Sequence, residues 1–239
     1  MNVALIFAGG VGSRMNSKAK PKQFLELYGK AIIIYTIEIF DNHPDIDGII
    51  ISCVKEWIDY LKDLITKFNI SKVIEIVPGG ETGQISIYNG LVAIEKHFPP
   101  NSIVLIHDGV RPLITNQTIT DNINQVKKYG SAITIAPTVE TFVVVDDNLS
   151  IVDIPERSAS KLAKAPQSFL LSNILSVHRQ AINDRVFNSI DSCTLMKMYN
   201  QSISLVEGPI ENIKITTPTD YFIFKAILEA REANQIFGI

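Results

Sequence analysis

The residues best suited to chemistry lie close together near the start of the chain. Three glycines, Gly9, Gly10 and Gly12, are followed by several cations, among them Arg14 and Lys22. Glycines let the backbone turn tightly and bring its N–H groups close to a ligand. Backbone donors and fixed cations together form a cradle for a polyphosphate. The segment therefore predicts a nucleotide-binding loop, and the alternative is a bare turn between a strand and a helix.

Two familiar phosphate-binding motifs do not fit this loop. A P-loop has a Lys-Ser or Lys-Thr pair after its glycines, and no such pair follows here. A dinucleotide fingerprint has a further glycine at the position of Met15. The loop therefore indicates a nucleotide site outside both classes and counts against a dehydrogenase.

A second candidate is Asp108, which follows the apolar run Ile103–His107. A carboxylate that faces a triphosphate needs a divalent cation between them, and Mg²⁺ binds through one or two carboxylates plus phosphate oxygens. Asp108 is thus predicted to hold Mg²⁺, with capping of the next turn as the alternative. We expect His107 to be structural, because no second His or Cys lies at metal-ligand spacing. Arg111 is left outside the catalytic set as a partner for a nearby carboxylate.

Two further segments leave their role open. The double glycine Gly79-Gly80 precedes a helical pattern that contains Ser86. This fits either a serine that hydrogen-bonds a base or ribose, or a plain glycine turn. Lys214 lies in a short β-like run, on the face opposite Ile213 and Ile215. It is either an exposed lysine or a third phosphate cation.

The elements that must position these residues alternate between strand and helix patterns. Strands are expected at Val3–Ala8, Gly48–Val54, Val73–Val77, Ile103–His107 and Ala132–Ala136, and helices at Ala31–Phe40, Glu56–Phe68, Thr82–His97 and Asn116–Lys128. Continuous apolar strands between helices predict an α/β fold with a mostly parallel sheet covered on both faces. Ligands of such sheets bind at the carboxyl ends of the strands, where the glycine loop begins.

The alternation breaks after Pro137. Thr141–Val145 and Ser150–Ile154 read as two strands of a hairpin joined by Asp146-Asp147-Asn148. We interpret residues 138–160 or so as an arm that packs on a second subunit, with an edge hairpin as the alternative. Later elements are expected as helices at 170–181, 191–199 and 218–234 and a strand at 203–206. Without a linker-like stretch, residues 1–239 are interpreted as a single domain.

Bulk composition limits the class of protein. The 239 residues carry a net charge of −3, which argues against non-specific nucleic-acid binding, so an anionic substrate needs a local cluster of cations. No stretch approaches the ~18 apolar residues of a membrane span. The two cysteines form neither a metal spacing nor a disulfide framework, and the start lacks signal-peptide features. These features predict a cytoplasmic protein without a membrane partner.

Taken together, the motifs resemble those of the cytidylyltransferases that act on sugar-alcohol phosphates, from Leu5 to about Ala226. The five ordered motifs are the glycine loop with Pro21-Lys22-Gln23, Gly79-Gly80 with Ser86, His107-Asp108 with Arg111-Pro112, Ala165-Pro166-Gln167, and Asn212-Ile213-Lys214-Ile215-Thr216. The resemblance implies a Rossmann-like nucleotidyltransferase fold, a three-layer sandwich, that uses CTP and Mg²⁺ and forms a homodimer through its hairpin arm.

The resemblance also implies roles for individual residues. The resemblance implies that the phosphates are contacted by the catalytic residues Arg14, Lys22 and Lys214. It implies that the nucleotide is bound by Ala8, Gly9, Gly10, Gly12, Gly79, Gly80, Ser86 and Asp108, and that Asp108 also holds Mg²⁺. Thr141 and Arg157 lie on the arm and bind the acceptor's phosphate in the partner subunit's site.

Two branches of this family share the pattern. The opening Ala8-Gly9-Gly10 is similar to the branch that uses ribitol 5-phosphate for teichoic acid or capsule synthesis. The alternative is the branch that uses 2-C-methyl-D-erythritol 4-phosphate for isoprenoid synthesis.

The chain departs from the family pattern at Gly83, where an arginine is usual, at Gly109, and at Asp191-Ser192-Cys193-Thr194. A nucleotidyltransferase for another base or sugar, and an inactive nucleotide-binding subunit, are the remaining alternatives.

Overall fold

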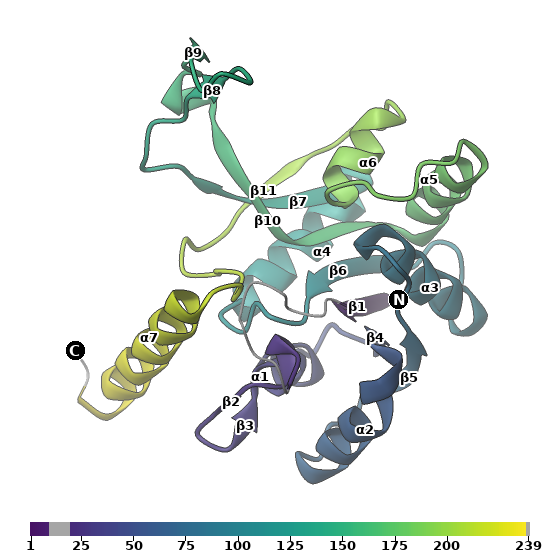
Figure 1. Cartoon of the computed structure of the whole chain (residues 1–239). Helices are drawn as coiled ribbons and strands as arrows, with labels where there is room; N and C mark the ends of the chain where they lie inside the picture. Colours follow the sequence, from purple (N-terminus) through teal and green to yellow (C-terminus); the bar gives the residue numbers. More distant parts are fainter. Residues whose placement is uncertain (10–19, 238–239) are drawn as a thin grey trace.

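A seven-stranded sheet forms the centre of the protein, in a computed structural model that describes residues 1–9 and 20–237 (Figure 1). Its strands are β1 (Asn2–Ala8), β4 (Gly48–Cys53), β5 (Val73–Pro78), β6 (Ile103–Asp108), β7 (Ser131–Pro137), β10 (Lys161–Leu170) and β11 (Leu205–Glu207). They are ordered β11-β7-β10-β6-β1-β4-β5. Only β10 is antiparallel to its neighbours among these strands. The predicted mostly parallel sheet is confirmed.

Helices cover both faces of this sheet. On one face lie α1 (Ile32–Asp41), α2 (Ile58–Lys67) and α4 (Asn116–Tyr129), and on the other lie α3 (Gly83–His97), α5 (Leu171–Asn183) and α6 (Ser192–Met198). The alternation of β1 accounts for the two layers, because Ala4 and Ile6 enter the first core while Val3 and Leu5 enter the second. The predicted three-layer α/β sandwich is therefore observed.

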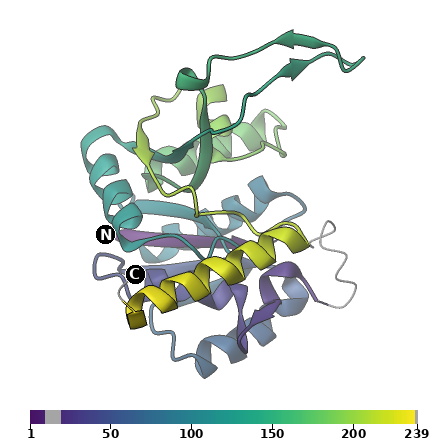
Figure 2. The same ribbon diagram turned by 90° about the vertical axis from the view of Figure 1, so that its left-hand side faces the viewer.

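The last helix, α7 (Pro218–Phe237), packs against the protein through a third, smaller apolar cluster. Phe224 of α7 is fully buried with Val110, which follows β6, and with Ile215, which precedes α7. Figure 2 shows α7 running along the outside of the sandwich. The segment that carries Lys214 is thus held between the sheet and α7.

Strand β10 was not predicted. Pro166 lies in its middle, and proline disfavours a strand because it cannot donate to the ladder. The pairing of β10 with β7 shifts in register between Ala163 and Gln167, so that three residues of β10 oppose Thr134 alone. This bulge accommodates the proline. Two short strands, β2 (Glu26–Leu27) and β3 (Lys30–Ala31), were also missed.

The predicted hairpin is present as β8 (Val144–Val145) and β9 (Ile151–Asp153), each shorter than expected. The carboxylate of Asp146 accepts hydrogen bonds from the backbone N–H groups of Asn148 and Ser150, both at 2.9 Å, and so closes the turn. Figure 2 shows the hairpin projecting well beyond the sandwich. Over the described ranges, no helix combines the length and the apolar character needed to cross a bilayer.

Candidate active site

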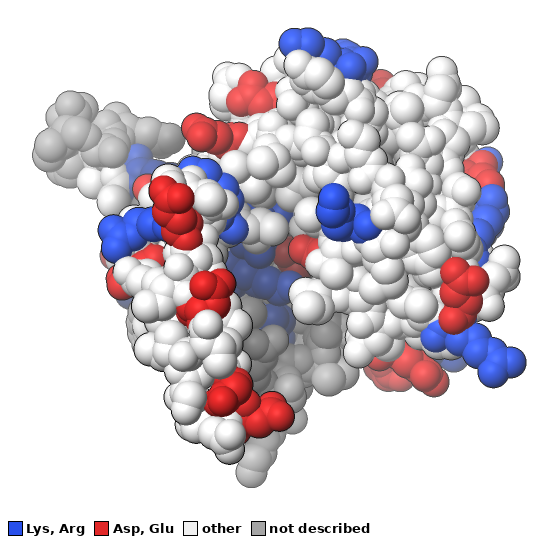
Figure 3. Space-filling model, turned by 90° about the horizontal axis from the view of Figure 1, so that it is seen from above, with Lys and Arg blue, Asp and Glu red and all other residues white. Residues whose placement is uncertain are grey.

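A cavity of about 340 Å³ opens where β1 and β6 end. Phe7 and Asp108 line it from these strands, Lys164 and Gln167 line it from β10, and Lys214 comes from the segment before α7. Figure 3 shows a hollow between the projecting arm and the rest of the molecule, with Lys and Arg side chains at its base. The cavity therefore lies at the carboxyl ends of the strands, as the sequence predicts.

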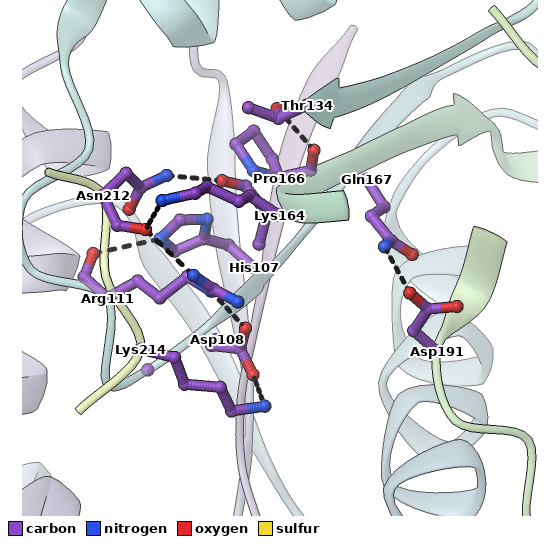
Figure 4. Close-up of polar contacts among 12 residues, drawn as sticks. His107, Asp108, Arg111, Thr134, Lys164, Pro166, Gln167, Asp191, Asn212 and Lys214 are labelled. Atoms are coloured by element: carbon purple, nitrogen blue, oxygen red, sulfur yellow. Dashed lines mark hydrogen bonds and ion pairs between the residues drawn. The ribbon is translucent and has the colours of Figure 1, made fainter. Parts of the chain in front are cut away.

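Asp108 is the carboxylate at the centre of this site, with only 8% of its side chain exposed. Its Oδ2 accepts from Nε of Arg111 at 2.7 Å, and its Oδ1 pairs with Nζ of Lys214 at 2.6 Å (Figure 4). Burial alone raises the pKa of this carboxyl, but the two cations outweigh it and hold the pKa well below its usual range. Asp108 is thus a permanent anion that organises cations, and its side chain pairs with them instead of capping the turn.

Lys214 reaches Asp108 from a segment that is not a strand. The predicted β-like run at residues 213–215 is wrong in this respect, because the segment pairs with no strand of the sheet, although the N–H of Ile215 donates to the carbonyl oxygen of Val110 at 3.0 Å. The predicted alternation does hold: Ile215 is fully buried, whereas 40% of the Lys214 side chain is exposed. Lys214 is therefore a paired cation at the cavity and not an isolated surface lysine.

The two neighbours of Asp108 are structural, as predicted. Arg111 bridges Asp108 and the carbonyl oxygen of Asn212, to which its Nη1 donates at 2.9 Å. His107 is fully buried, and its Nε2 lies 3.2 Å from the carbonyl oxygen of Arg111. Burial lowers the pKa of His107 to about 4, so the ring is neutral at pH 7. Within the described residues, no three His, Cys, Asp or Glu side chains cluster as metal ligands.

Gly9, just after β1, and the Gly79-Gly80 turn meet at Ser86, which is buried. A Cβ added at Gly9 would lie 2.7 Å from the Ser86 Oγ, and one added at Gly79 would lie 3.1 Å from it. The same Oγ accepts from the N–H of Gly80 at 3.0 Å and donates to the carbonyl oxygen of Thr82 at 2.8 Å. Ser86 thus holds the turn in shape, and the lack of side chains at Gly9 and Gly79 allows the close approach.

The segment with Lys22 is attached to the end of β1. Gln23 is buried, and its Nε2 donates to the carbonyl oxygen of Ala8 at 2.8 Å. Lys22 begins the same short 3-10 turn, so it lies next to the residue that bonds the end of β1. The predicted site residues Gly10, Gly12 and Arg14 lie outside the described residues.

The two predicted acceptor residues lie together on the arm. Nη2 of Arg157 donates to the Oγ1 of Thr141 at 3.0 Å, and both residues are exposed. Neither lines the cavity that contains Asp108. The structure therefore joins Thr141 and Arg157 with each other and not with the site of their own chain.

Other residues of the cavity were not predicted as site residues. Gln167 donates through Nε2 to Oδ2 of Asp191 at 2.9 Å (Figure 4) and accepts from the N–H of Cys193 at 2.8 Å. Asp191 in turn caps α6 by accepting from the N–H of Thr194 at 2.7 Å. The motif with Gln167 was noted, but its contacts depend on β10. Gly83, where the family pattern has an arginine, also lines the cavity, and a Cβ there would meet no atom within 4 Å.

A three-layer α/β fold with a glycine turn and clustered cations at the carboxyl ends of its strands fits a nucleotidyltransferase. The family model described as 2-C-methyl-D-erythritol 4-phosphate cytidylyltransferase matches residues 2–230. The chain therefore belongs to this family of cytidylyltransferases, and it is a CTP-dependent nucleotidyltransferase.

Individual relatives fall into the two branches. A protein of Vibrio parahaemolyticus named ribitol-5-phosphate cytidylyltransferase is 59% identical over 238 residues, with 100% of both chains covered. A protein of Streptococcus agalactiae serotype III with the same name is 54% identical, again over 100% of both. A 2-C-methyl-D-erythritol 4-phosphate cytidylyltransferase of Clostridium botulinum is 37% identical, covering 95% of this chain and 97% of the relative.

A solved structure confirms the fold. The crystal structure of 4-diphosphocytidyl-2C-methyl-D-erythritol synthase from Anaerococcus prevotii superimposes with a TM-score of 0.82 at 28% sequence identity. It covers 95% of this chain and 96% of that one.

Proposed function

We propose that this enzyme transfers the cytidylyl group of CTP to D-ribitol 5-phosphate, releasing CDP-ribitol and pyrophosphate. The choice of D-ribitol 5-phosphate as the acceptor is supported by full-length sequence identity of 54–59% to relatives named for ribitol 5-phosphate. Relatives named for 2-C-methyl-D-erythritol 4-phosphate reach 36–37%, which makes that acceptor the alternative. The product is suited to building a teichoic acid or capsule polymer.

The reaction depends more on cations placed to hold the two polyanionic substrates than on a general base. A phosphate oxygen of the acceptor, already ionised at pH 7, attacks the α-phosphorus, and the bond to the bridging oxygen breaks as pyrophosphate leaves. Two polyanions must therefore be held in line and the developing charge stabilised. Lys214 stands at the cavity for this purpose, and the family resemblance adds Lys22 and Arg14. His107 is fully buried and its Nε2 lies against the carbonyl oxygen of Arg111, so the ring has no access to the substrates as a base.

The residues present fit a divalent cation held by one carboxylate and by phosphate oxygens. Asp108 is ionised and lines the cavity, and each of its oxygens has a second lone pair besides the one its cation uses. We propose that Asp108 would hold Mg²⁺. When bound, this ion neutralises phosphate charge and supports the departure of pyrophosphate.

We also propose that the arm forms a homodimer. Its ladder is only a few residues long, and such a hairpin is marginal alone in water. Its exposed apolar side chains are Val139, Phe142, Val143, Val144, Val145, Leu149, Ile151, Val152 and Ile154. Exposed apolar side chains gathered on one projecting element are typical of a protein interface. In a dimer, the exposed Thr141–Arg157 pair would complete the acceptor site of the other subunit.

The replacement Arg157→Ala tests this assignment. It is expected to raise KM for the polyol phosphate about tenfold or more and to change KM for CTP little, because the contact is with the acceptor. Steady-state kinetics with each substrate varied in turn measures the two constants. The exposed Lys161→Ala, at the base of the arm, is the matched control. An unchanged KM for the acceptor would remove Arg157 from the site.

The proposed reaction is tested directly by product analysis. The enzyme is incubated with Mg²⁺, D-ribitol 5-phosphate and one nucleoside triphosphate at a time. With CTP, we expect equal amounts of CDP-ribitol and pyrophosphate, and with ATP, GTP or UTP we expect neither. Comparable turnover with UTP would indicate a different nucleotidyltransferase. Binding of CTP without any turnover would favour an inactive nucleotide-binding subunit.

A further inference from the structure

A lysine of β10, Lys164, is buried beside the site with only 8% of its surface exposed. Its Nζ donates to the carbonyl oxygen of Ile210 at 2.6 Å and to that of Asn212 at 3.3 Å. The ammonium is thus bonded to backbone carbonyl groups of a segment that lies far away in the sequence. The role proposed above involves neither Lys164 nor this contact.

The bulge in β10 places Lys164 there. Lys164, Ala165 and Pro166 together oppose Thr134, and a bulge of this kind re-aims side chains. The carbonyl groups of the bulge are bonded, since Nδ2 of Asn212 donates to Ala165 at 2.7 Å and Oγ1 of Thr134 donates to Pro166 at 2.7 Å (Figure 4). The direction of Lys164 is therefore fixed by the fold.

The segment that Lys164 holds is the one that carries Lys214. The carbonyl oxygen of Asn212 accepts from Lys164 and also from Nη1 of Arg111. Two residues further on, Lys214 pairs with Asp108. Figure 4 shows Lys164 and Arg111 converging on Asn212, with Lys214 extending separately toward Asp108. The buried Lys164 and the nearly buried Arg111 thus hold the backbone immediately before the cation that faces the cavity.

Burial of the Lys164 ammonium makes the free energy of folding less favourable. A buried ammonium loses its hydration, and carbonyl dipoles replace that hydration only in part. Burial lowers the pKa of Lys164, and the neighbouring charge of Arg111 lowers it further. Residues that break folding rules in this way concentrate at functional sites.

We propose that Lys164 is a positioning residue that holds the Ile210–Asn212 backbone so that Lys214 stays directed at Asp108 and at the bound phosphates. Lys164 lines the cavity, but its ammonium is turned to the carbonyl oxygens of Ile210 and Asn212. This inference rests on the proposed function, because it takes Lys214 as a phosphate contact. A displacement of about 1 Å at a reacting group costs up to roughly 10² in rate, so a loosened segment has a measurable effect.

A double-mutant cycle between Lys164 and Lys214 tests the proposal. Lys164→Gln keeps a neutral donor and is expected to lower kcat about tenfold, whereas Lys164→Met removes the donor and lowers kcat further. In a Lys214→Ala background, the same changes are expected to cost less than about twofold, since coupled residues are non-additive. Lys161→Gln, an exposed lysine on the same strand, is the matched control and leaves kcat unchanged.

The cycle compares the fold loss of kcat caused by a Lys164 change in the wild-type and in the Lys214→Ala backgrounds. Equal fold losses in both backgrounds would overturn the proposal, because a residue that only stabilises the fold acts independently of Lys214. If Lys164→Met fails to fold, the cycle with Lys164→Gln decides alone. The affinity for CTP, measured by calorimetry on the four proteins of the Lys164→Gln cycle, is expected to show the same coupling. A wild-type enzyme that binds CTP but does not use D-ribitol 5-phosphate would contradict the proposed acceptor and still leave this coupling measurable.

Discussion

Replacing Lys214 by alanine is expected to lower kcat by roughly 10²–10³, the usual cost of removing one donor that stabilises a transition state. The lysine is half-exposed at the cavity and is held against a carboxylate that is always ionised. Its charge is therefore fixed in place before the substrates arrive, and no reorganisation is needed as charge develops on the phosphates. Initial rates of pyrophosphate release at saturating CTP and acceptor measure the effect.

The fold should tolerate this change well. Asp108 keeps Arg111 as a partner, and the backbone near Lys214 stays bonded through Ile215 and Asn212. Lys225→Ala, which removes a loose surface pair with Glu229 at 3.8 Å, serves as the matched control and leaves kcat unchanged. If Lys214→Ala turns over within threefold of the wild type, Lys214 is not a phosphate contact in the transition state.

Replacing Asp108 by asparagine is expected to damage both stability and turnover. The change removes the anion that Arg111 and Lys214 share, and it leaves the nearly buried Arg111 without a charged partner. Loss of one partner of a buried ion pair costs about 3 kcal/mol or more. For a chain of this length, such a loss lowers Tm by roughly 6–12 °C.

Thermal unfolding followed by circular dichroism measures this loss. The exposed Asp63→Asn on α2 is the matched control and should leave Tm unchanged. A variant Asp108→Asn that keeps the wild-type Tm would show that the pairs with Arg111 and Lys214 contribute little to folding. Full turnover by that variant would, in addition, exclude Asp108 from the site.

The elements predicted correctly are those whose signals are local. Val3–Ala8 and Ile103–His107 are continuous apolar runs, and their burial on both faces of the sheet follows from composition alone. The hairpin turn at Asp146 is likewise encoded by its own side chain. Strand β10 carries no such signal, because Pro166 argues against a strand and only its partners β6 and β7 define it.

The candidate site divides in the same way. Residue types and spacing singled out Asp108 and the glycine turns, since their chemistry is visible within a few residues. The resemblance, and not the spacing, favoured Lys214 as a functional cation. The structure then showed its pair with Asp108. The contacts of Lys164 and Gln167 depend on the bulge in β10 and on segments distant in sequence, so no local pattern reveals them.

The central claim concerns the acceptor, and one comparison tests it most directly. The kcat/KM for D-ribitol 5-phosphate is measured against that for 2-C-methyl-D-erythritol 4-phosphate, with CTP and Mg²⁺, by pyrophosphate release. We predict a preference of about a hundredfold or more for D-ribitol 5-phosphate, equivalent to ~2.7 kcal/mol in transition-state stabilisation. The reverse preference would contradict the proposal and assign the enzyme to the other branch of its family.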